Sequence, residues 1–367
     1  GCIFVINLRK RYRINSVVEF FSYQFGNVGI FTYSFLIITR LISEIFANLI
    51  VVGLVFGKEG TYDYNISIFI VMVVTLSYSY LGGFRNSIKT DVIQMIVFII
   101  LIVFMIVSFF FIPLELNKEL FVAKIYDISN PAYALILVAF LQIWSYPIHD
   151  PVMMDRGFIS SIKKTKKSFF YSFFLSSILI LLFSLIGIFL SGYSLDNISF
   201  IEAISIYFGR TSSYIIFFLL IISAMSTIDS TLSSCSKLIV SDLGLLKNNI
   251  FNGRLVMLIF SMLGLAFIFL NTKDLFTAVA VSGTAAIFLS PTYIMLIIFK
   301  QNVSKLSLLV SFFISVSGSI LYYLESQAIY TNFSSYLSLD HKYKTLLVIN
   351  ILVVLICFFS AFMLKKK

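Results

Sequence analysis

One polar segment, Ser223-Ala224-Met225-Ser226-Thr227-Ile228-Asp229-Ser230-Thr231-Leu232-Ser233-Ser234, interrupts an apolar run that extends from about Tyr214 to about Val240. A run of that length is long enough to cross a lipid bilayer as a helix. Hydroxyl side chains recur at positions 223, 226, 227, 230 and 234. At about 100° per residue these positions share one stripe. The segment therefore predicts a membrane helix with one face lined by hydroxyl oxygens.

Asp229 adds an ionisable group to this segment. A charged side chain is costly inside a bilayer, so its carboxylate should face a cavity, a partner group or an ion. Small hard cations such as sodium prefer oxygen ligands, which hydroxyls and carbonyls supply. A Ser and Thr stripe alone is also typical of a packing seam between membrane helices. The carboxylate favours a cation site over a seam.

The composition places the chain among polytopic α-helical membrane proteins. Hydrophobic residues make up 59% of the 367 residues and charged residues 12%, and the mean hydropathy is +1.00. The apolar residues fall in long runs, as membrane helices require. Cys2, Cys235 and Cys357 are too scattered for a disulfide framework or a metal-ligand motif. No cluster of residues suggests a nucleophile with its base, so we do not expect an enzyme.

Ten spanning helices are predicted, after an interfacial stretch from Ser16 to Phe25. Their expected bounds are about 29–57, 66–81, 88–112, 131–148, 168–192, 212–242, 252–271, 275–299, 305–324 and 345–364.

The basic residues are distributed unevenly between the loops on the two sides. Alternate loops hold most of them, at 9–13, 85–89, 156–167, 237–254, 300–305 and 365–367. Because cytoplasmic loops are enriched in Lys and Arg, this pattern predicts that both ends of the chain are cytoplasmic. It also accounts for the net charge of +10 without a nucleic-acid partner.

A second motif, Gly82-Gly83-Phe84-Arg85-Asn86-Ser87-Ile88-Lys89-Thr90-Asp91-Val92-Ile93-Gln94, lies where one predicted helix ends and the next begins. Together with Ser-Thr-x-Asp-Ser-x-Leu at 226–232, it resembles the sodium:solute symporter family, which includes sodium–proline, sodium–glucose and sodium–sialic acid symporters. The resemblance covers essentially the whole chain.

This resemblance implies a transporter fold of five plus five core helices related by an inverted repeat. The glycine motif would join core helices four and five, and residues 223–234 would lie in core helix eight. Counting back, the chain is expected to begin near the end of core helix two, without core helix one and most of core helix two. Residues 1–367 are thus expected to form one partial transporter domain.

The resemblance also implies ion ligands. A sodium half-site on core helix eight would use the carbonyl of Ser223 and the hydroxyls of Ser226 and Thr227, its other half coming from core helix one. A possible second sodium site matches Asp91, Ser226, Asp229 and Ser230. Asp229 stands where that site would otherwise use a hydroxyl, and two neighbouring carboxylates call for a cation or a shared proton. Alternatively, Asp91 merely caps its helix.

Two further groups are candidate substrate contacts. Arg40 and Glu44 are spaced i, i+4 in the first predicted helix, which suits either a structural ion pair or recognition of a substrate carboxylate by Arg40. Gln142, Trp144 and Tyr146 cluster beside Pro147, which should break its helix. They line a substrate site, or Trp144 and Tyr146 are interfacial anchors.

These observations lead to one leading functional hypothesis. The chain is expected to be a multi-pass symporter of the cell membrane that couples sodium entry to import of a small organic solute, such as an amino acid, a carboxylate or a sugar. Na⁺ is the coupling ion, and the partners are the solute and the lipid bilayer. The alternatives are proton coupling through Asp91 and Asp229, a membrane-sensor domain, and a non-functional fragment.

Overall fold

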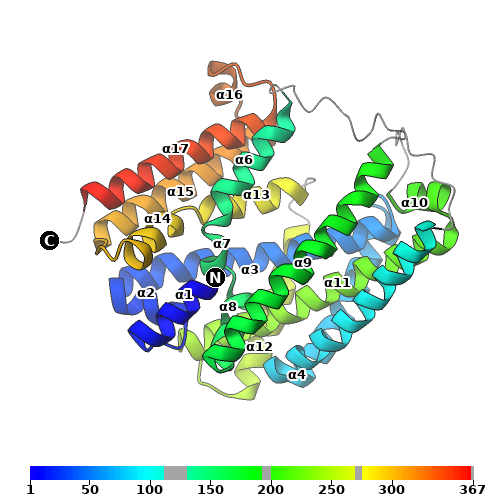
Figure 1. Cartoon of the computed structure of the whole chain (residues 1–367), viewed down its shortest axis with the longest axis horizontal. Coiled ribbons are helices and arrows are strands. Elements are labelled where there is room, and N and C mark those ends of the chain that lie inside the picture. The colour runs from blue at the N-terminus through cyan, green and yellow to red at the C-terminus, as the bar shows by residue number, and fades with distance from the viewer. Residues whose placement is uncertain (111–129, 192–199, 269–274, 365–367) are drawn as a thin grey trace. The chain divides into compact units, whose positions relative to one another are not determined.

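The computed structural model describes residues 1–110, 130–191, 200–268 and 275–364, and every regular element in these ranges is a helix (Figure 1). The chain divides into two compact units. Unit 1 comprises Gly1–Ser43, Asp127–Lys166 and Asp274–Lys367, and unit 2 comprises Glu44–Tyr126 and Lys167–Lys273. The long helix α3 (Asn27–Phe56) contributes to both units, and so does α9 (Ile162–Ser191).

The remaining elements each belong to one unit. Those of unit 1 are α1 (Cys2–Asn7), η1 (Leu8–Tyr12), α2 (Val17–Phe25), α6 (Pro131–Ile143), α7 (Tyr146–His149), α8 (Pro151–Ile159), α13 (Leu275–Ala285), α14 (Leu289–Tyr293), η3 (Ile294–Ile298), α15 (Lys305–Ser326), α16 (Asn332–Tyr336) and α17 (Lys342–Met363). Those of unit 2 are α4 (Tyr62–Phe110), α10 (Phe200–Phe208), α11 (Arg210–Ser236), η2 (Lys237–Asp242) and α12 (Ile250–Ile268).

Seven helical segments of the described ranges are long and apolar enough to cross a membrane. They are Asn27–Phe56, Tyr62–Gly83, Ser87–Val107, Ile162–Ile188, Arg210–Asp242, Lys305–Ser326 and Lys342–Met363. The bent pair Val279–Ala285 and Leu289–Ile298 forms an eighth candidate, and Pro131–Ile143 and Ile250–Ala266 are shorter apolar helices. A helix thus occupies each of the ten predicted positions, although the predicted ends at 112, 192 and 271 lie outside the described residues. The predicted interfacial stretch corresponds to α2, which Ser16 caps.

At three places the predicted helices are interrupted or joined differently from the expectation. The helices predicted at 66–81 and 88–112 are two halves of α4, separated at Gly83, whose φ of 57° and ψ of −170° are not helical. The helix predicted at 131–148 ends at Ile143 and resumes as α7, with Pro147 in its first turn. The helix predicted at 275–299 bends by 43° between α13 and α14. Pro147 and Pro291 explain these two breaks, because proline lacks the amide hydrogen that a continuing helix donates.

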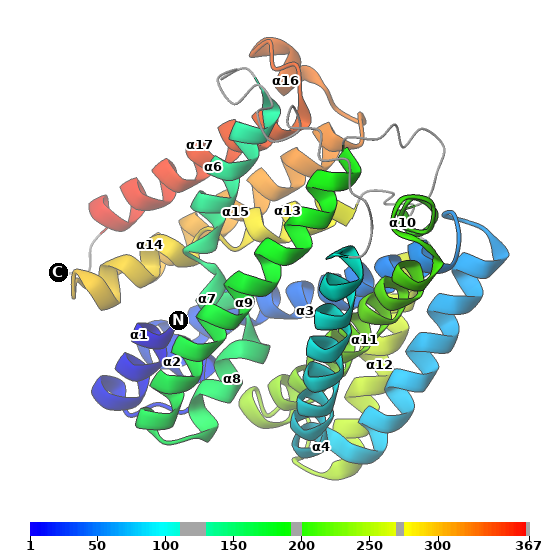
Figure 2. The ribbon, with the colours of Figure 1, turned by 45° about the vertical axis from the view of Figure 1, so that its right-hand side comes forward.

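In unit 2, α11 packs alongside α4, α10 and α12 (Figures 1 and 2). The residues of α11 from Ile228 to Cys235 are all buried. An apolar cluster anchors the start of the helix and consists of Ile102, Met105, Ile186, Ile204, Phe208, Ile215, Ile216 and Leu219. The polar segment of α11 is therefore buried in unit 2, against α4.

In unit 1, α15 and α17 pack side by side, and α13 and α6 pack against them. The contact face of α15 carries small residues at every fourth position: Ser307, Ser311, Ser315 and Ser319, all buried. The Ser360 hydroxyl of α17 donates to the Ser307 carbonyl (3.3 Å), and Ser319 donates to the Val281 carbonyl (2.9 Å). This face is a small-residue packing seam of the kind that joins membrane helices.

Candidate ion-binding site

The candidate site lies within unit 2, where α4 and α11 are in contact. Asp91 belongs to the membrane-spanning segment Ser87–Val107 and Asp229 to the segment Arg210–Asp242. Asp229 is completely buried and Asp91 is partly buried. The two carboxylates are near enough to each other for their negative charges to repel. Two acidic groups from different helices therefore meet inside apolar, membrane-length segments.

Asp229 accepts a hydrogen bond from α4 at each of its two oxygens. The Ser79 hydroxyl donates to Oδ1 and the Thr90 hydroxyl donates to Oδ2, both at 2.7 Å. Ser79 precedes the break at Gly83 and Thr90 follows it. Gly83 can adopt its conformation because it has no Cβ to collide with the backbone. The break thus lets both halves of α4 present a hydroxyl to one carboxylate.

At Asp91 the arrangement is reversed, because here the carboxylate lies on α4 and the hydroxyl donor on α11. The hydroxyl of Ser226, on α11, donates to Asp91 Oδ1 at 2.8 Å. Gln94, one turn after Asp91 on α4, donates from Nε2 to the Tyr78 hydroxyl at 3.5 Å, and that hydroxyl donates to the Met225 carbonyl (3.2 Å). The buried Oε1 of Gln94 accepts no hydrogen bond within the described part of the chain. The structure therefore leaves one buried oxygen acceptor beside the two carboxylates.

The other predicted ligands on α11 make local hydrogen bonds. Thr227 donates to the Ser223 carbonyl (3.0 Å), and Ser230 donates to the Ser226 carbonyl (2.7 Å). Such back-bonding leaves the lone pairs of a hydroxyl oxygen available. Ser230 is buried beside Asp229, whereas the side chain of Ser223 is exposed. The structure brings Asp91, Ser226 and Asp229 together, whereas the hydrogen bond that Thr227 donates stays within α11.

The ligand atoms of this cluster suit a small hard cation or a proton. They are carboxylate, hydroxyl and amide oxygens, which alkali and alkaline-earth ions prefer over softer ligands. Nowhere in the described ranges do three or more His, Cys, Asp and Glu side chains gather as they would around a transition metal.

Sequence reasoning missed Tyr78, Ser79 and Thr90 as members of this cluster. The run Ser77-Tyr78-Ser79-Tyr80 directly precedes Gly82-Gly83, and Thr90 is part of the Thr-Asp motif itself. Hydroxyls within two turns on either side of a glycine break were the available signal, because such a break brings both helix ends toward one point.

Arg40 and Glu44 both lie on α3 and are both half-buried. The Arg40 guanidinium is near His149 in unit 1. The Ser43 hydroxyl donates to the Arg40 carbonyl, and Asn48 donates to the Glu44 carbonyl. The ion pair predicted between Arg40 and Glu44 stays a prediction.

Gln142 lies in a second polar cluster, within unit 1. Its Nε2 donates to the Thr284 hydroxyl (3.2 Å) and the Ala280 carbonyl (3.4 Å) of α13, and Thr284 donates to Asn350 Oδ1 (2.9 Å). Gly283 permits this approach, because a Cβ there would overlap Gln142 Oε1.

Trp144 and Tyr146 differ from Gln142, being 44% and 37% exposed. Trp144 packs against Phe140 with its ring centroid 6.2 Å away. Gln142 is thus tied to a buried polar network, whereas Trp144 and Tyr146 are partly exposed.

Comparisons with known proteins identify the fold. No protein-family model matches the chain, and no curated protein matches it. Among solved structures it is similar to a Na⁺-coupled sialic acid symporter, described in a substrate-bound, outward-open state that reveals a novel Na⁺ site. The two chains share 16% identity with a TM-score of 0.72, and the match covers 99% of this chain and 80% of that chain. The chain therefore has the helical transporter fold of this symporter.

Proposed function

We propose that the protein is a sodium-coupled symporter that imports a small organic solute across the cell membrane. The observation that carries this proposal is the pair of carboxylates, Asp91 and Asp229, joined by hydroxyls between two membrane-length segments of unit 2. A buried negative charge needs a cation or a proton, because its isolated burial in apolar surroundings is strongly unfavourable. The fold shared with a Na⁺-coupled symporter supports sodium.

In this proposal Asp91, Asp229, Ser226 and Ser230 hold the coupling ion. Ser223, through its carbonyl, and Thr227 belong to a second sodium half-site on the same helix. An ion bound between α4 and α11 neutralises the repulsion between the two carboxylates and so favours the conformation in which these helices are in contact. The sodium gradient does work on solute only if that conformation also binds solute more tightly.

The solute site is proposed in unit 1. Gln142 and its partners Thr284 and Asn350 supply amide and hydroxyl groups, and the Nδ2 of Asn350 has no hydrogen-bond acceptor among the described residues. Such groups suit a polar solute. Arg40 favours an anionic or zwitterionic one. Glu44, Trp144 and Tyr146 remain proposed substrate contacts that rest on the sequence alone.

A proton is the second candidate for the coupling ion, on a specific observation. The Ser79 hydroxyl lies 2.8 Å from the Thr75 carbonyl as well as 2.7 Å from Asp229, and the Thr90 hydroxyl lies 2.9 Å from the Ser87 carbonyl as well as 2.7 Å from Asp229. Each hydroxyl carries one hydrogen for two acceptors. A proton on Asp229 would supply a third hydrogen to these four contacts, so protonation is favoured when no cation is bound.

Solute uptake into proteoliposomes separates these candidates. The full-length gene product would be tested with amino acids, carboxylates and sugars under an inward sodium gradient and, separately, under an inward proton gradient. For sodium coupling we expect sodium-driven uptake that falls at least about tenfold in Asp91→Asn and Ser226→Ala, since each loses a charged or charge-assisted ligand. Ser184→Ala, which removes an exposed hydroxyl from α9, should transport normally.

The proton candidate has a different signature. It is uptake driven by the proton gradient without sodium in the parent and in Ser226→Ala, and no such uptake in Asp229→Asn. This result would identify the coupling ion as a proton and not sodium. Absence of uptake under either gradient, with every solute of the panel, would contradict the symporter proposal and leave the sensor alternative.

A further inference from the structure

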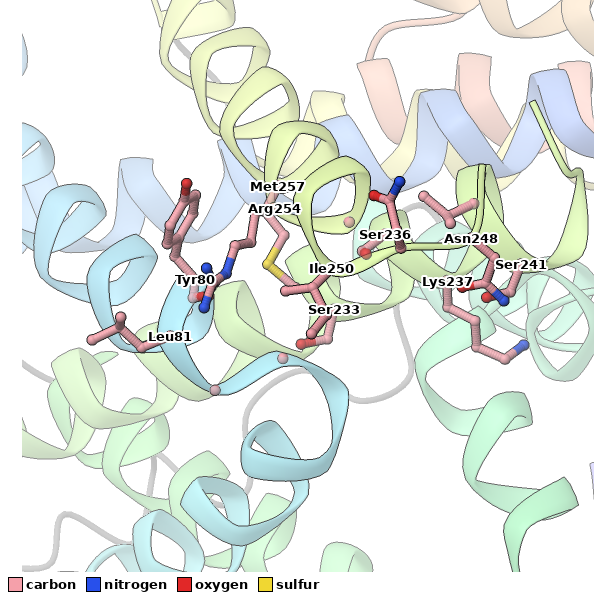
Figure 3. Close-up of a pocket in the computed structure, with 15 residues that line it drawn as sticks. Tyr80, Leu81, Ser233, Ser236, Lys237, Ser241, Asn248, Ile250, Arg254 and Met257 are labelled. Carbon is pink, nitrogen blue, oxygen red and sulfur yellow. Dashed lines mark hydrogen bonds between the residues drawn. The ribbon is translucent and has the colours of Figure 1, made fainter. Parts of the chain in front are cut away.

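A cavity lies in unit 2, at the end of the membrane-spanning segments. It measures about 640 Å³ and is bounded by the break in α4, the end of α11 and the start of α12 (Figure 3). Tyr80, Gly82 and Gly83 contribute one wall, and Ser233, Ser236 and Arg254 contribute others. None of the residues predicted to bind ion or solute lines this cavity.

Arg254 is held in one orientation at this cavity. Its Nε donates to the Tyr80 carbonyl at 2.8 Å, and its guanidinium lies over the Tyr80 ring, 4.8 Å from the centroid. Within the described part of the chain, its two terminal nitrogens donate no hydrogen bond. A guanidinium fixed in this way presents a planar pair of donors, which matches the oxygens of a phosphate or carboxylate.

Ser233 supplies an independent sign of a missing ligand. It lines the cavity and is only 1% exposed, yet its hydroxyl has no hydrogen-bond partner in the described residues. A ligand oxygen would give this buried hydroxyl the hydrogen-bond partner that it lacks.

The rim of the cavity is apolar and exposed. Leu81 and Ile250 both line it and are both 76% exposed. The other cation, Lys237, forms a 2.8 Å ion pair with Asp242 and so adds no unbalanced charge. The cavity lies where segments Tyr62–Gly83 and Arg210–Asp242 end, at the depth of lipid headgroups. Apolar side chains beside a fixed cation at that depth match a headgroup phosphate with its acyl chains.

We propose that this cavity binds the phosphate group of an anionic phospholipid. The phosphate oxygens accept hydrogen bonds from the terminal nitrogens of Arg254 and from the Ser233 hydroxyl, and the acyl chains contact Leu81 and Ile250. The charge distribution of the loops predicts that this end of the segments is cytoplasmic, so the lipid belongs to the inner leaflet.

Lipid binding to the delipidated, detergent-purified full-length protein tests the proposal by native mass spectrometry. The probes are dioleoylphosphatidylglycerol, dioleoylphosphatidylcholine and inorganic phosphate. We expect saturable binding of phosphatidylglycerol that weakens roughly tenfold or more in Arg254→Gln, because a hydrogen-bonded charge pair is lost. Lys247→Gln removes a basic residue that precedes α12 and does not line the cavity, so this variant should bind normally.

Ser233→Ala is a second test variant that does not depend on the folding of Arg254→Gln, because it leaves the contact between Arg254 and Tyr80 intact. It should weaken binding several-fold, as expected for one hydrogen bond to a charged group. Equal losses in Lys247→Gln, or unchanged binding in both cavity variants, would overturn the proposal. Inorganic phosphate that binds as tightly as phosphatidylglycerol would overturn the lipid assignment, and equal binding of phosphatidylcholine would overturn the preference for anionic lipid. The assay needs no transport, so its outcome is independent of the proposed symport.

Discussion

At the scale of single residues, Asp229 and Ser315 show how similar sequence features serve different ends. Both lie in helices with a stripe of hydroxyl residues. Ser315 belongs to the α15 seam, where its hydroxyl lies 3.6 Å from the sulfur of Cys357 on α17. Asp229 instead brings a carboxylate to hydroxyls of α4 and to the neighbourhood of Asp91. A carboxylate in the stripe thus distinguishes an ion site from a packing seam.

Replacing Asp229 tests whether its charge is balanced by an ion. Asp229→Asn keeps the side-chain volume and removes the charge, so the sodium-free protein should be as stable as the parent or more stable. The parent should gain roughly 2.7 kcal/mol at a sodium concentration about 100 times its dissociation constant, and the variant should lose most of that gain. Thermal unfolding with sodium and with choline as the replacement cation measures both.

The control for this experiment is Asp63→Asn, which neutralises an exposed carboxylate in the first turn of α4. It should keep the full sodium-dependent rise in melting temperature. A rise of parental size in Asp229→Asn would contradict the assignment of this carboxylate to the ion site.

At the scale of the element, α4 is decisive because its break at Gly83 places Ser79 and Thr90 on the same carboxylate. A straight helix would separate these residues by 11 positions, or about 16 Å along its axis. The break is therefore part of the site. The spacing of the apolar residues cannot show that Ser79 and Thr90 meet at one carboxylate, because both halves of α4 have the same helical period.

Gly83→Ala should both destabilise the protein and weaken ion binding. An alanine at φ 57° and ψ −170° is strained by about 1–3 kcal/mol, so α4 tends to straighten and to withdraw one of its two hydroxyls. Denaturant unfolding measures the first effect, and the sodium-dependent melting shift measures the second. Gly60→Ala places an alanine at another positive φ, 79°, in the loop before α4, and should lose stability while keeping the shift. The same shift in both variants would show that the break does not shape the site.

At the scale of the whole molecule, the sequence predicted the membrane class and the positions of ten helices, because long apolar runs specify both. The glycine motif also indicated the break at Gly83, since it lies between two predicted helices. Pro147 gave one interruption correctly, but residues 286–288 between α13 and α14 carry no glycine or proline themselves. Such a bend depends on packing around Pro291 and on partners far away in the sequence.

The candidate ion site was predicted to a similar extent. The sequence supplied Asp91, Ser226 and Asp229, and the structure joins them within unit 2. It did not supply Ser79 or Tyr78, since their contacts with α11 span about 150 residues of chain. Local patterns specify which helix carries a polar face, and tertiary packing alone specifies which hydroxyls meet it.

The predicted orientation in the membrane can be checked by labelling. In a variant without Cys2, Cys235 and Cys357, a cysteine introduced at Ser161 should resist a membrane-impermeant maleimide added to intact cells, because the basic loops are predicted to be cytoplasmic. A cysteine introduced at Lys58, in the first predicted external loop, should react. Both positions are exposed in the structure, so access to the reagent decides the result. The reverse pattern would invert the topology.

The proposed coupling depends most on sodium binding between α4 and α11. Equilibrium binding of radioactive sodium to the purified full-length protein measures it without knowledge of the solute. We expect saturable binding in the parent and in Asp63→Asn, with affinity at least about tenfold weaker in Asp91→Asn and in Ser226→Ala. Sodium binding that is unchanged in both site variants, or absent from a folded parent protein, would contradict the account.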